Sequence, residues 1–244
     1  MASEFAPCSE AQKQAVLDRL QVIRQNIADA CREAGRTEQE VTLMAVTKTV
    51  SPELINLAVD AGVTTLGENR VQEFLSKCDA YRKEAEVQFI GHLQTNKVKQ
   101  IIDRVTLIHS VDSLHLAEAV SKAAASKGIT MPVLLEVNIG GEASKSGVSP
   151  AELPDLLKAV QQLPNLRTDG LMTIPPPMTD EDEQIRVFTE MRELFDRLRQ
   201  SVPMQTLSMG MSGDYAAAIR CGSTLVRIGS ALFGARYYPP KPEG

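Results

Sequence analysis

Eight short apolar runs, separated by stretches with a helical pattern, constrain the fold of this chain more than any other feature. Most of the runs show little alternation of apolar and polar residues, as expected of strands that are covered on both faces. Strands that alternate with helices form βαβ units, in which the strands are parallel. The runs are Val41–Val46, Val63–Leu66, Val87–Gly91, Val105–Val111, Pro132–Ile139, Leu166–Ile174, Thr206–Gly210 and Thr224–Gly229.

Each of the first seven runs precedes a stretch that we expect to be helical. These stretches are Pro52–Ala61, Arg70–Glu84, Asn96–Ile102, Ser113–Lys127, Pro150–Gln162, Asp180–Ser201 and Asp214–Cys221. Eight such units in 244 residues fit a closed (β/α)8 barrel. The main alternative is a doubly wound open sheet, which usually has a glycine-rich turn after its first strand. The first run continues as TKTVSPE, without glycine, so we predict an α/β fold with a single TIM barrel.

A long amphipathic helix precedes the first unit. Residues Ser9–Ala34 carry one apolar stripe, and Gly35 is a natural stop. No change in composition marks a second domain. We therefore expect one domain over residues 1–244, with an N-terminal helical segment at 1–40 and a proline-rich tail at 237–244.

Composition excludes several classes of function. The net charge is −5 and no basic run occurs, which argues against nucleic acid as a partner. No apolar run is long enough to cross a membrane, and the start MASEFAPCSE lacks the features of a secretory signal or a transit peptide. The four cysteines form no C-x-x-C pair and are expected to be reduced thiols. We therefore expect a cytoplasmic protein.

In a TIM barrel the functional residues gather at the C-terminal ends of the strands. The first strand ends at Lys48, directly after an apolar run. A charge at that place is costly unless it has a task, and a lysine there is suited to forming a Schiff base. The alternative is a solvated lysine just past the end of the strand.

The ends of the last two strands have the pattern of a phosphate site. TIM barrels frequently bind phosphate with the loops after strands seven and eight. Ser212 and Ser230 offer hydroxyls there, and Gly213 and Gly229 allow close approach to the backbone. Alternatively, the glycines only form turns and Ser212 only caps a helix.

A lysine and a phosphate cradle at the same barrel end together describe a site for pyridoxal 5′-phosphate. Arg227 would then face the edge of the pyridine ring. Because an arginine does not readily release a proton, it would keep the ring nitrogen unprotonated and weaken the cofactor as an electron sink.

Other polar residues have two interpretations each. His92 either lines the pocket or is structural, and Glu68-Asn69 either bonds a ligand or caps the next helix. Lys145 is either a second amine near the site or a surface lysine. His109 and His115 lack the neighbouring carboxylates or cysteines that a metal site needs.

Six motifs carry a resemblance to a known family. They are AVTKTVSPE, LGENRVQE, FIGHLQTNK, VNIGGEASKSGV, GLMTI and LSMGMSGDYAAAIRCGSTLVRIGSALFGAR. They lie within Val41 to Arg236, and in this order they resemble the pyridoxal phosphate homeostasis proteins, also called proline synthetase co-transcribed homologue proteins.

The resemblance implies a barrel like the N-terminal domain of alanine racemase and the vitamin B6 cofactor pyridoxal 5′-phosphate as a Schiff base on Lys48. It also implies phosphate contacts, an arginine beside the pyridine ring and an asparagine that lines the pocket. The cofactor-binding residues that we predict are Lys48, Asn69, Met211, Ser212, Arg227, Gly229 and Ser230.

The same resemblance implies a carrier that sequesters the cofactor and delivers it to apoenzymes, as a monomer or weak dimer, with no catalytic residues. The alternative is an amino-acid racemase with weak activity. A racemase needs a proton donor opposite the lysine, which alanine racemase takes from a second, β-rich domain. We expect no such domain here, and Tyr237 and Tyr238 are weak substitutes in the tail.

Overall fold

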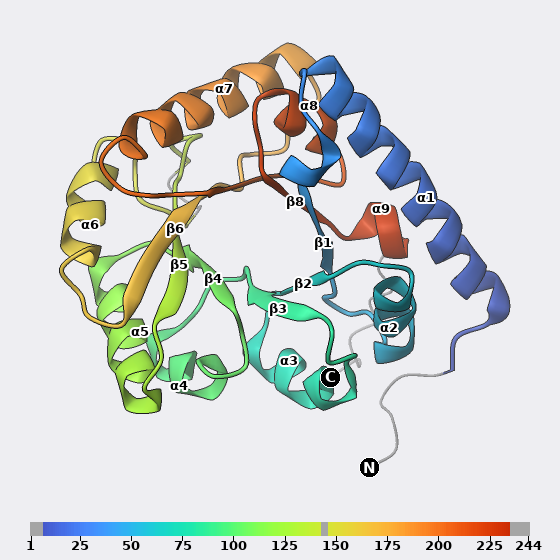
Figure 1. The fold of residues 1–244 in the computed structure, drawn as a ribbon, viewed down its shortest axis with the longest axis horizontal. Helices are drawn as coiled ribbons and strands as arrows, with labels where there is room; N and C mark the ends of the chain where they lie inside the picture. The colour runs from blue at the N-terminus through green and yellow to red at the C-terminus, as the bar shows by residue number, and fades with distance from the viewer. Residues whose placement is uncertain (1–6, 143–145, 235–244) are drawn as a thin grey trace, which may run out of the picture.

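Eight parallel strands form a closed barrel at the centre of the molecule (Figure 1). The structure, a computed structural model, describes residues 7–142 and 146–234. Each strand pairs with the next one along the chain, and β8 pairs with β1. The predicted α/β barrel is therefore confirmed. The strands are β1 (Thr42–Val46), β2 (Thr65–Glu68), β3 (Glu86–Phe89), β4 (Leu107–Val111), β5 (Met131–Glu136), β6 (Leu166–Met172), β7 (Thr206–Met211) and β8 (Leu225–Ile228).

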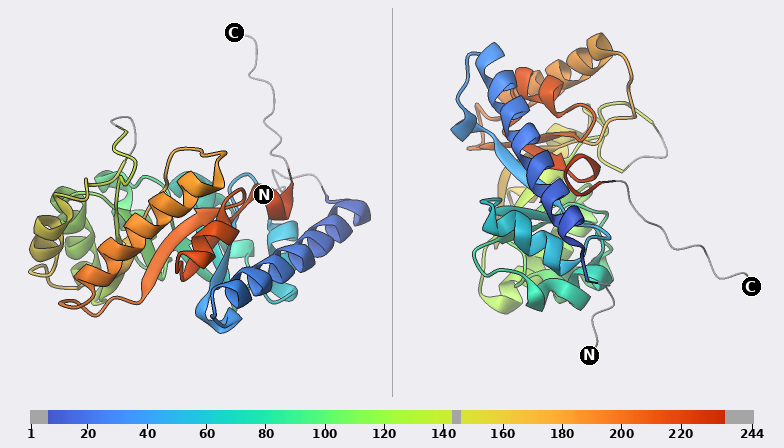
Figure 2. Two further views of the ribbon diagram at one scale, coloured as in Figure 1. Left: turned by 90° about the horizontal axis from the view of Figure 1, so that it is seen from above. Right: turned by 90° about the vertical axis from the view of Figure 1, so that its right-hand side faces the viewer.

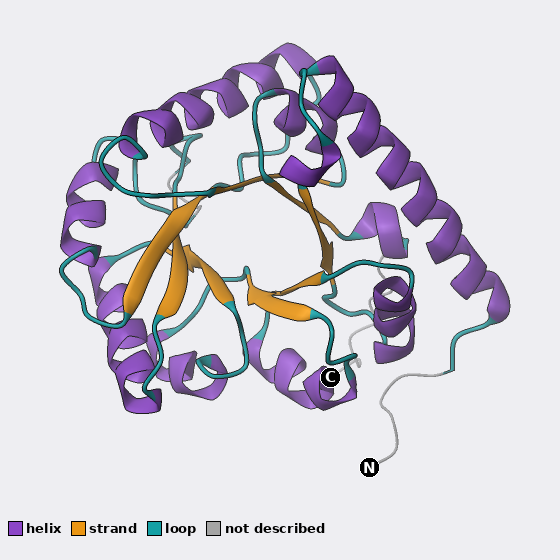
Figure 3. Cartoon of the chain, in the orientation of Figure 1, coloured by secondary structure: helices purple, strands orange, loops and turns teal. Residues whose placement is uncertain are grey.

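Helices surround the barrel (Figure 3). Those that follow the strands are α2 (Pro52–Asp60), α3 (Val71–Lys77), α4 (Val98–Ile101), α5 (Leu114–Lys127), α6 (Leu153–Val160), α7 (Glu181–Leu198), α8 (Tyr215–Arg220) and α9 (Ser230–Phe233). The helix that we predicted over Arg70–Glu84 was too long. It ends at Lys77, whose φ of −131° leaves the helical region, and continues as a 3-10 turn over Cys78–Ala80. The sequence pattern did not predict α9.

The predicted N-terminal helix is confirmed as α1 (Glu10–Glu33). Its start is fixed by a capping box, in which Ser9 Oγ accepts from Gln12 N and the Gln12 side chain accepts from Ser9 N. The helix runs along the outside of the barrel and packs on α2, α8 and α9 (Figure 2). Its apolar stripe is buried there, at Val16, Leu20, Ile23, Ile27 and Ala30.

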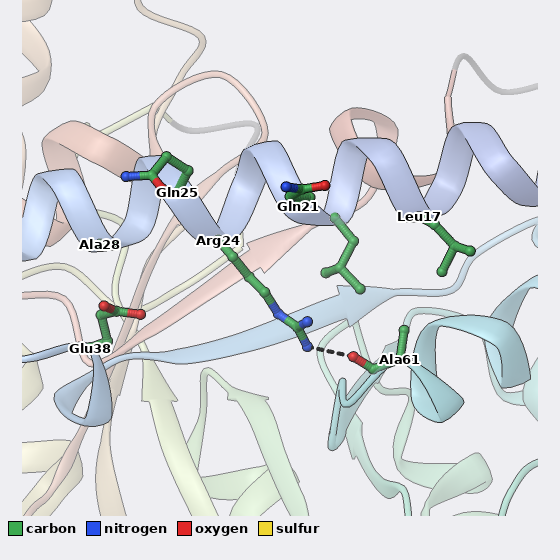
Figure 4. A pocket seen from close by; sticks show the side chains of 8 residues that line it. Leu17, Gln21, Arg24, Gln25, Ala28, Glu38 and Ala61 are labelled. Atoms are coloured by element: carbon green, nitrogen blue, oxygen red, sulfur yellow. Dashed lines mark hydrogen bonds between the residues drawn. The ribbon is translucent and has the colours of Figure 1, made fainter.

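The side chain of Arg24 joins α1 to the end of α2. Arg24 Nη2 donates to the carbonyl oxygen of Ala61, at the end of α2, over 2.7 Å (Figure 4). A hollow of about 480 Å³ lies beside this contact. It opens along α1, on the outside of the barrel, and contains none of the residues predicted for the cofactor.

Apolar side chains inside the barrel show which strand positions point inward. One buried group joins Met44, Val46, Ile90 and Leu225, and another joins Leu107, Leu134 and Met172. Side chains two residues apart on a strand point to the same face. Arg227 follows Leu225 on β8 at this spacing, so it continues an inward-facing row, and Lys48 lies in the turn directly beyond the end of β1.

None of the helices in the described ranges is both long and apolar enough to cross a membrane.

Candidate functional site

The strand register places the predicted residues at one end of the barrel. Val46 of β1 lies opposite Gly67 of β2, and Lys48 and Asn69 each follow two residues later. On the other side of β1, Ala45 lies opposite Ile228 of β8, which Gly229 follows directly. The C-terminal end of β1 therefore lies between the strand ends that carry Asn69 and Gly229.

Arg227 is held in a fixed position inside the barrel. It is only 3% exposed, and its guanidinium donates through Nη1 to Ser208 Oγ at 2.6 Å and through Nη2 to the Thr173 carbonyl at 2.7 Å. Burial lowers its pKa to about 10, although the negative charges of Asp214 and Glu136 act in the opposite direction. A guanidinium with this pKa is charged at neutral pH, so Arg227 is a fixed cationic donor.

A chain of hydrogen bonds continues from Arg227 across the barrel. Ser208 Oγ lies 3.1 Å from Nδ1 of His109, and Nε2 of His109 lies 2.7 Å from Gln88 Oε1. The pKa of His109 lies well below its usual value, mainly because of burial and also because of the positive Arg227. The ring is therefore neutral. With an oxygen acceptor at Gln88, its proton lies on Nε2, so the Ser208 hydroxyl donates to Nδ1 and accepts from Arg227.

Sequence reasoning predicted Arg227 but missed Ser208, His109 and Gln88, the other members of this hydrogen-bonded chain. Ser208 and His109 are polar residues inside apolar runs, at positions that face inward, and this was the signal available for them. We had considered His109 only as a metal ligand. Within the described ranges, no group of three or more histidines, cysteines and carboxylates could hold a metal ion.

Glu136 adds a titratable carboxyl to the same interior. It ends β5 and is only 6% exposed. Burial and the nearby negative charge of Asp112 raise its pKa to about 7, while Arg227 acts to lower it. Its charge therefore changes near neutral pH.

The ends of β7 and β8 meet through Ser212. The hydroxyl oxygen of Ser212 accepts from the backbone N–H of Gly229 and from that of Ala231, each at 3.2 Å. Two backbone donors thus converge on one oxygen. A phosphate oxygen has the same acceptor character, so this arrangement fits a phosphate group.

A tight turn carries Ser212. Its ends are joined because Asp214 Oδ1 accepts from the backbone N–H of Met211 at 2.5 Å. Ser212 and Gly213 lie at the tip of this turn, where Gly213 is exposed. Ser230, the first residue of α9, is also exposed, so its hydroxyl can reach a ligand at this end of the barrel.

Lys48 and Asn69 have unused polar groups. Lys48 is half-buried and, among the residues that the structure describes, its amine has no hydrogen bond or ion pair. The Oδ1 atom of Asn69 is buried and lacks a partner in the same part of the chain. Buried polar atoms without partners are uncommon, and a bound ligand is one of the things that can satisfy them.

The structure gives the remaining candidate residues other surroundings. The His92 side chain is 63% exposed and lies 4.0 Å from Asp112. Glu68 is fully buried and does not cap α3. Its Oε1 atom accepts from the Thr47 hydroxyl at 2.7 Å, and its Oε2 atom is buried without a partner among the described residues. Lys145, the tail at 237–244 and the two tyrosines in it lie outside the described residues.

Known proteins match almost the whole chain. The family model of the alanine racemase N-terminal domain matches residues 19–237. A pyridoxal phosphate homeostasis protein of Aquifex aeolicus is 45% identical over 224 residues, which cover 91% of this chain and 98% of the relative. The protein of the same name from Escherichia coli K12 is 40% identical over 231 residues, covering 93% and 99%.

Solved structures share the barrel. PipY of Synechococcus elongatus, with pyridoxal phosphate bound, is 31% identical and superposes with a TM-score of 0.76 over 90% of this chain and 100% of its own. An alanine racemase of Clostridium difficile has a TM-score of 0.72 at 18% identity, over 93% of this chain and 58% of the racemase. The chain therefore belongs to the pyridoxal phosphate homeostasis protein family, whose barrel is that of the alanine racemase N-terminal domain.

Proposed function

We propose that this protein binds pyridoxal 5′-phosphate as a Schiff base on Lys48 and that it sequesters the cofactor and delivers it to other proteins. The Lys48 amine would condense with the cofactor aldehyde, forming a C=N bond and releasing water. The observation that carries the proposal is the unengaged Lys48 amine at the same barrel end as the fixed cation of Arg227. The names of the relatives and the cofactor in PipY support it.

The other predicted residues fit the remaining parts of this ligand. Ser212, Gly229 and Ser230 supply hydroxyls and backbone donors for the phosphate, in the region where two N–H groups already meet one oxygen. Asn69 offers a polar side chain with a free oxygen next to Lys48, and Met211 lies in register with Arg227. We propose that these residues line the site.

Arg227 favours a carrier over a catalyst. Bound pyridoxal 5′-phosphate supplies an aldehyde and an electron-withdrawing ring, and the ring withdraws most strongly when its nitrogen is protonated. A charged guanidinium donates a hydrogen bond and accepts none, so a ring nitrogen facing Arg227 has to be the acceptor. The position of Arg227 therefore disfavours reactions that build up negative charge at an amino acid's α-carbon.

The second candidate function is weak amino-acid racemase activity. The likeness to alanine racemases favours it, but at 18% identity that likeness concerns the fold, and it covers 58% of the racemase. We propose that delivery to apoenzymes is the main role, carried out by a single-domain monomer or weak dimer in the cytoplasm.

Two experiments test this function. Borohydride reduction of the cofactor-loaded protein should trap pyridoxyl on Lys48, detected by mass spectrometry of peptides, and Lys48→Ala should lose both the adduct and the visible absorbance. An adduct on another lysine would refute the assignment. The loaded protein should also reactivate a pyridoxal phosphate apoenzyme, while amino acids incubated with it in deuterated water should keep their α-protons. Rapid α-proton exchange that depends on Lys48 would instead favour the racemase.

A further inference from the structure

The turn that carries Lys48 is bound on both sides by one helix of the next βα unit. The carbonyl oxygen of Thr47 accepts from Lys77 Nζ at 2.8 Å. The backbone N–H of Thr49 donates to Glu73 Oε1 at 2.5 Å. Lys77 and Glu73 both belong to α3, which follows β2. The residues before and after Lys48 are therefore fixed to the same helix.

Lys77 is a buried lysine with two hydrogen bonds and two ion pairs. Its side chain is 1% exposed, and besides Thr47 it contacts Glu73 Oε1 at 2.8 Å and Glu68 Oε1 at 3.6 Å. Lysines are almost never buried this deeply unless they are paired. Its Nζ donates hydrogen bonds to the Thr47 carbonyl and to Glu73, and Glu68 lies close enough for an ion pair, so these three partners surround the buried ammonium group.

Glu68 completes this cluster behind the turn. Its Oε1 atom accepts from the Thr47 hydroxyl and from the Tyr81 hydroxyl. Burial raises the pKa of Glu68, and the positive Lys77 is the strongest influence in the opposite direction. Thr47 is thus held at two groups, because Glu68 binds its hydroxyl and Lys77 binds its carbonyl oxygen.

Thr49 has a backbone conformation that its residue type disfavours. Its φ of 63° lies in the left-handed region, which a β-branched residue rarely enters. Such conformations persist where surrounding contacts over-determine them, and they concentrate at functional sites. Here the contact is the hydrogen bond to Glu73, which fixes the direction of the Lys48–Thr49 peptide.

We infer that Lys77 and Glu73 are positioning residues, which hold the Thr47–Thr49 turn so that the Lys48 amine points into the barrel. This inference rests on the proposed function, because it assumes that Lys48 bonds the cofactor. Without the contact to Glu73, Thr49 relaxes towards negative φ and the Lys48 backbone turns with it. The proposed phosphate contacts come from residues that follow β7 and β8, and none of them belongs to this turn.

The test compares two ligands on Glu73→Ala. Pyridoxine 5′-phosphate has an alcohol in place of the aldehyde and cannot condense with Lys48, but it keeps the ring and phosphate. We expect Glu73→Ala to weaken pyridoxal 5′-phosphate about tenfold, since a hydrogen bond to a charged group is lost. Binding of pyridoxine 5′-phosphate should stay within about twofold. Isothermal titration measures both.

Three further variants distinguish a positioning role of Glu73 from a general loss of protein stability. Glu73→Gln keeps an oxygen for the Thr49 N–H and should bind both ligands nearly as the wild type does. Gln72→Ala is the matched control, because Gln72 is the exposed neighbour of Glu73 on α3 and its side chain, within the described part of the chain, hydrogen-bonds with Gln100 alone. Thr49→Gly added to Glu73→Ala should recover part of the pyridoxal 5′-phosphate affinity, since glycine accepts positive φ without strain.

Equal weakening of the two ligands by Glu73→Ala would overturn the inference, as would unchanged affinity for both. Failure of Thr49→Gly to recover any affinity would also count against it. Failure of the proposed function would look different, since borohydride would then trap no adduct on Lys48 in the wild-type protein itself.

Discussion

The two sides of the barrel end hold their key residues by opposite means. Beside β1 and β2, the turn of Lys48 is fixed by buried charges, with Lys77 between Glu68 and Glu73. Beside β7 and β8, Arg227 is fixed by neutral groups, the Ser208 hydroxyl and a backbone carbonyl. One side therefore neutralises its charges internally, and the other keeps a cation whose hydrogen-bonding partners are neutral.

This difference matches what each side has to offer a ligand. A Schiff base needs an amine without competing partners, so the charges near Lys48 satisfy one another behind the turn and leave its side chain unengaged. The other side has to attract acceptors such as a phosphate or a ring nitrogen. A cation bonded to neutral groups keeps its attraction for them, whereas a direct carboxylate partner would cancel it.

Removing the charge of Lys77 should have the largest effect on the structure around Lys48. We expect Lys77→Met to lower the free energy of unfolding by about 3–5 kcal/mol, because it leaves buried carboxylates without their cation. Urea denaturation measures this. Adding Glu68→Gln should restore part of the loss, since one stranded charge is then removed as well. A loss below about 1 kcal/mol in Lys77→Met would mean that the cluster behaves like a solvated surface pair.

The Arg227 side contains one carboxyl whose charge depends on pH near neutrality. The pKa of Glu136 is raised to about 7, above its unfolded value. The stability that this shift provides is fully present below the unfolded pKa and is lost as the pH rises through 7. Between pH 4.5 and 8 the wild type should therefore lose roughly 3 kcal/mol of unfolding free energy that Glu136→Gln keeps. Urea denaturation at both pH values tests this, and an equal difference between the proteins at both would contradict it.

The fold could be predicted from sequence because its signals are local and repeated. Eight apolar runs with helices between them specify the barrel, and the ends of each observed strand lie within three residues of those predicted. Helix ends were harder. The predicted helix that starts at Arg70 stops early because Lys77 turns inward to reach Thr47, a residue thirty positions earlier that no local pattern connects with it.

The candidate site was predictable as far as strand ends reveal it. Lys48 and Ser212 are visible because each is polar and follows an apolar run, and Arg227 because it is a charged residue near the end of one. Their supports are not visible in this way. The Lys77 cluster and the His109–Ser208 pair join distant segments, and Glu68 looked like a ligand or cap until its buried contacts to Thr47 appeared. Polar residues at inward positions of apolar strands are the signal to use.

Removing the Ser208 hydroxyl tests whether its hydrogen bonds hold Arg227 in place. Ser208→Ala leaves both Arg227 Nη1 and His109 Nδ1 without their buried partner, which should lower the free energy of unfolding by about 2 kcal/mol. The same variant should weaken pyridoxal 5′-phosphate and pyridoxine 5′-phosphate alike, because both have the ring nitrogen. A variant that unfolds like the wild type would show that water replaces the hydroxyl.

Ser212→Ala should have the smallest effect on stability, and it best distinguishes the phosphate side of the proposed site from the Lys48 side. Ser212→Ala removes a half-buried hydroxyl whose two backbone donors can turn to water, so stability should change by less than about 1 kcal/mol. It also removes the hydrogen bond that we propose from Ser212 to the phosphate, which should weaken pyridoxal 5′-phosphate and pyridoxine 5′-phosphate by the same factor, about fivefold. Saturated with cofactor, this variant should still form the borohydride adduct on Lys48 in full. Glu73→Ala should instead affect only the aldehyde ligand, because in the proposed site α3 holds the turn of Lys48 and Ser212 binds the phosphate. If Ser212→Ala also discriminated between the ligands, the two sides of the barrel end would not act independently.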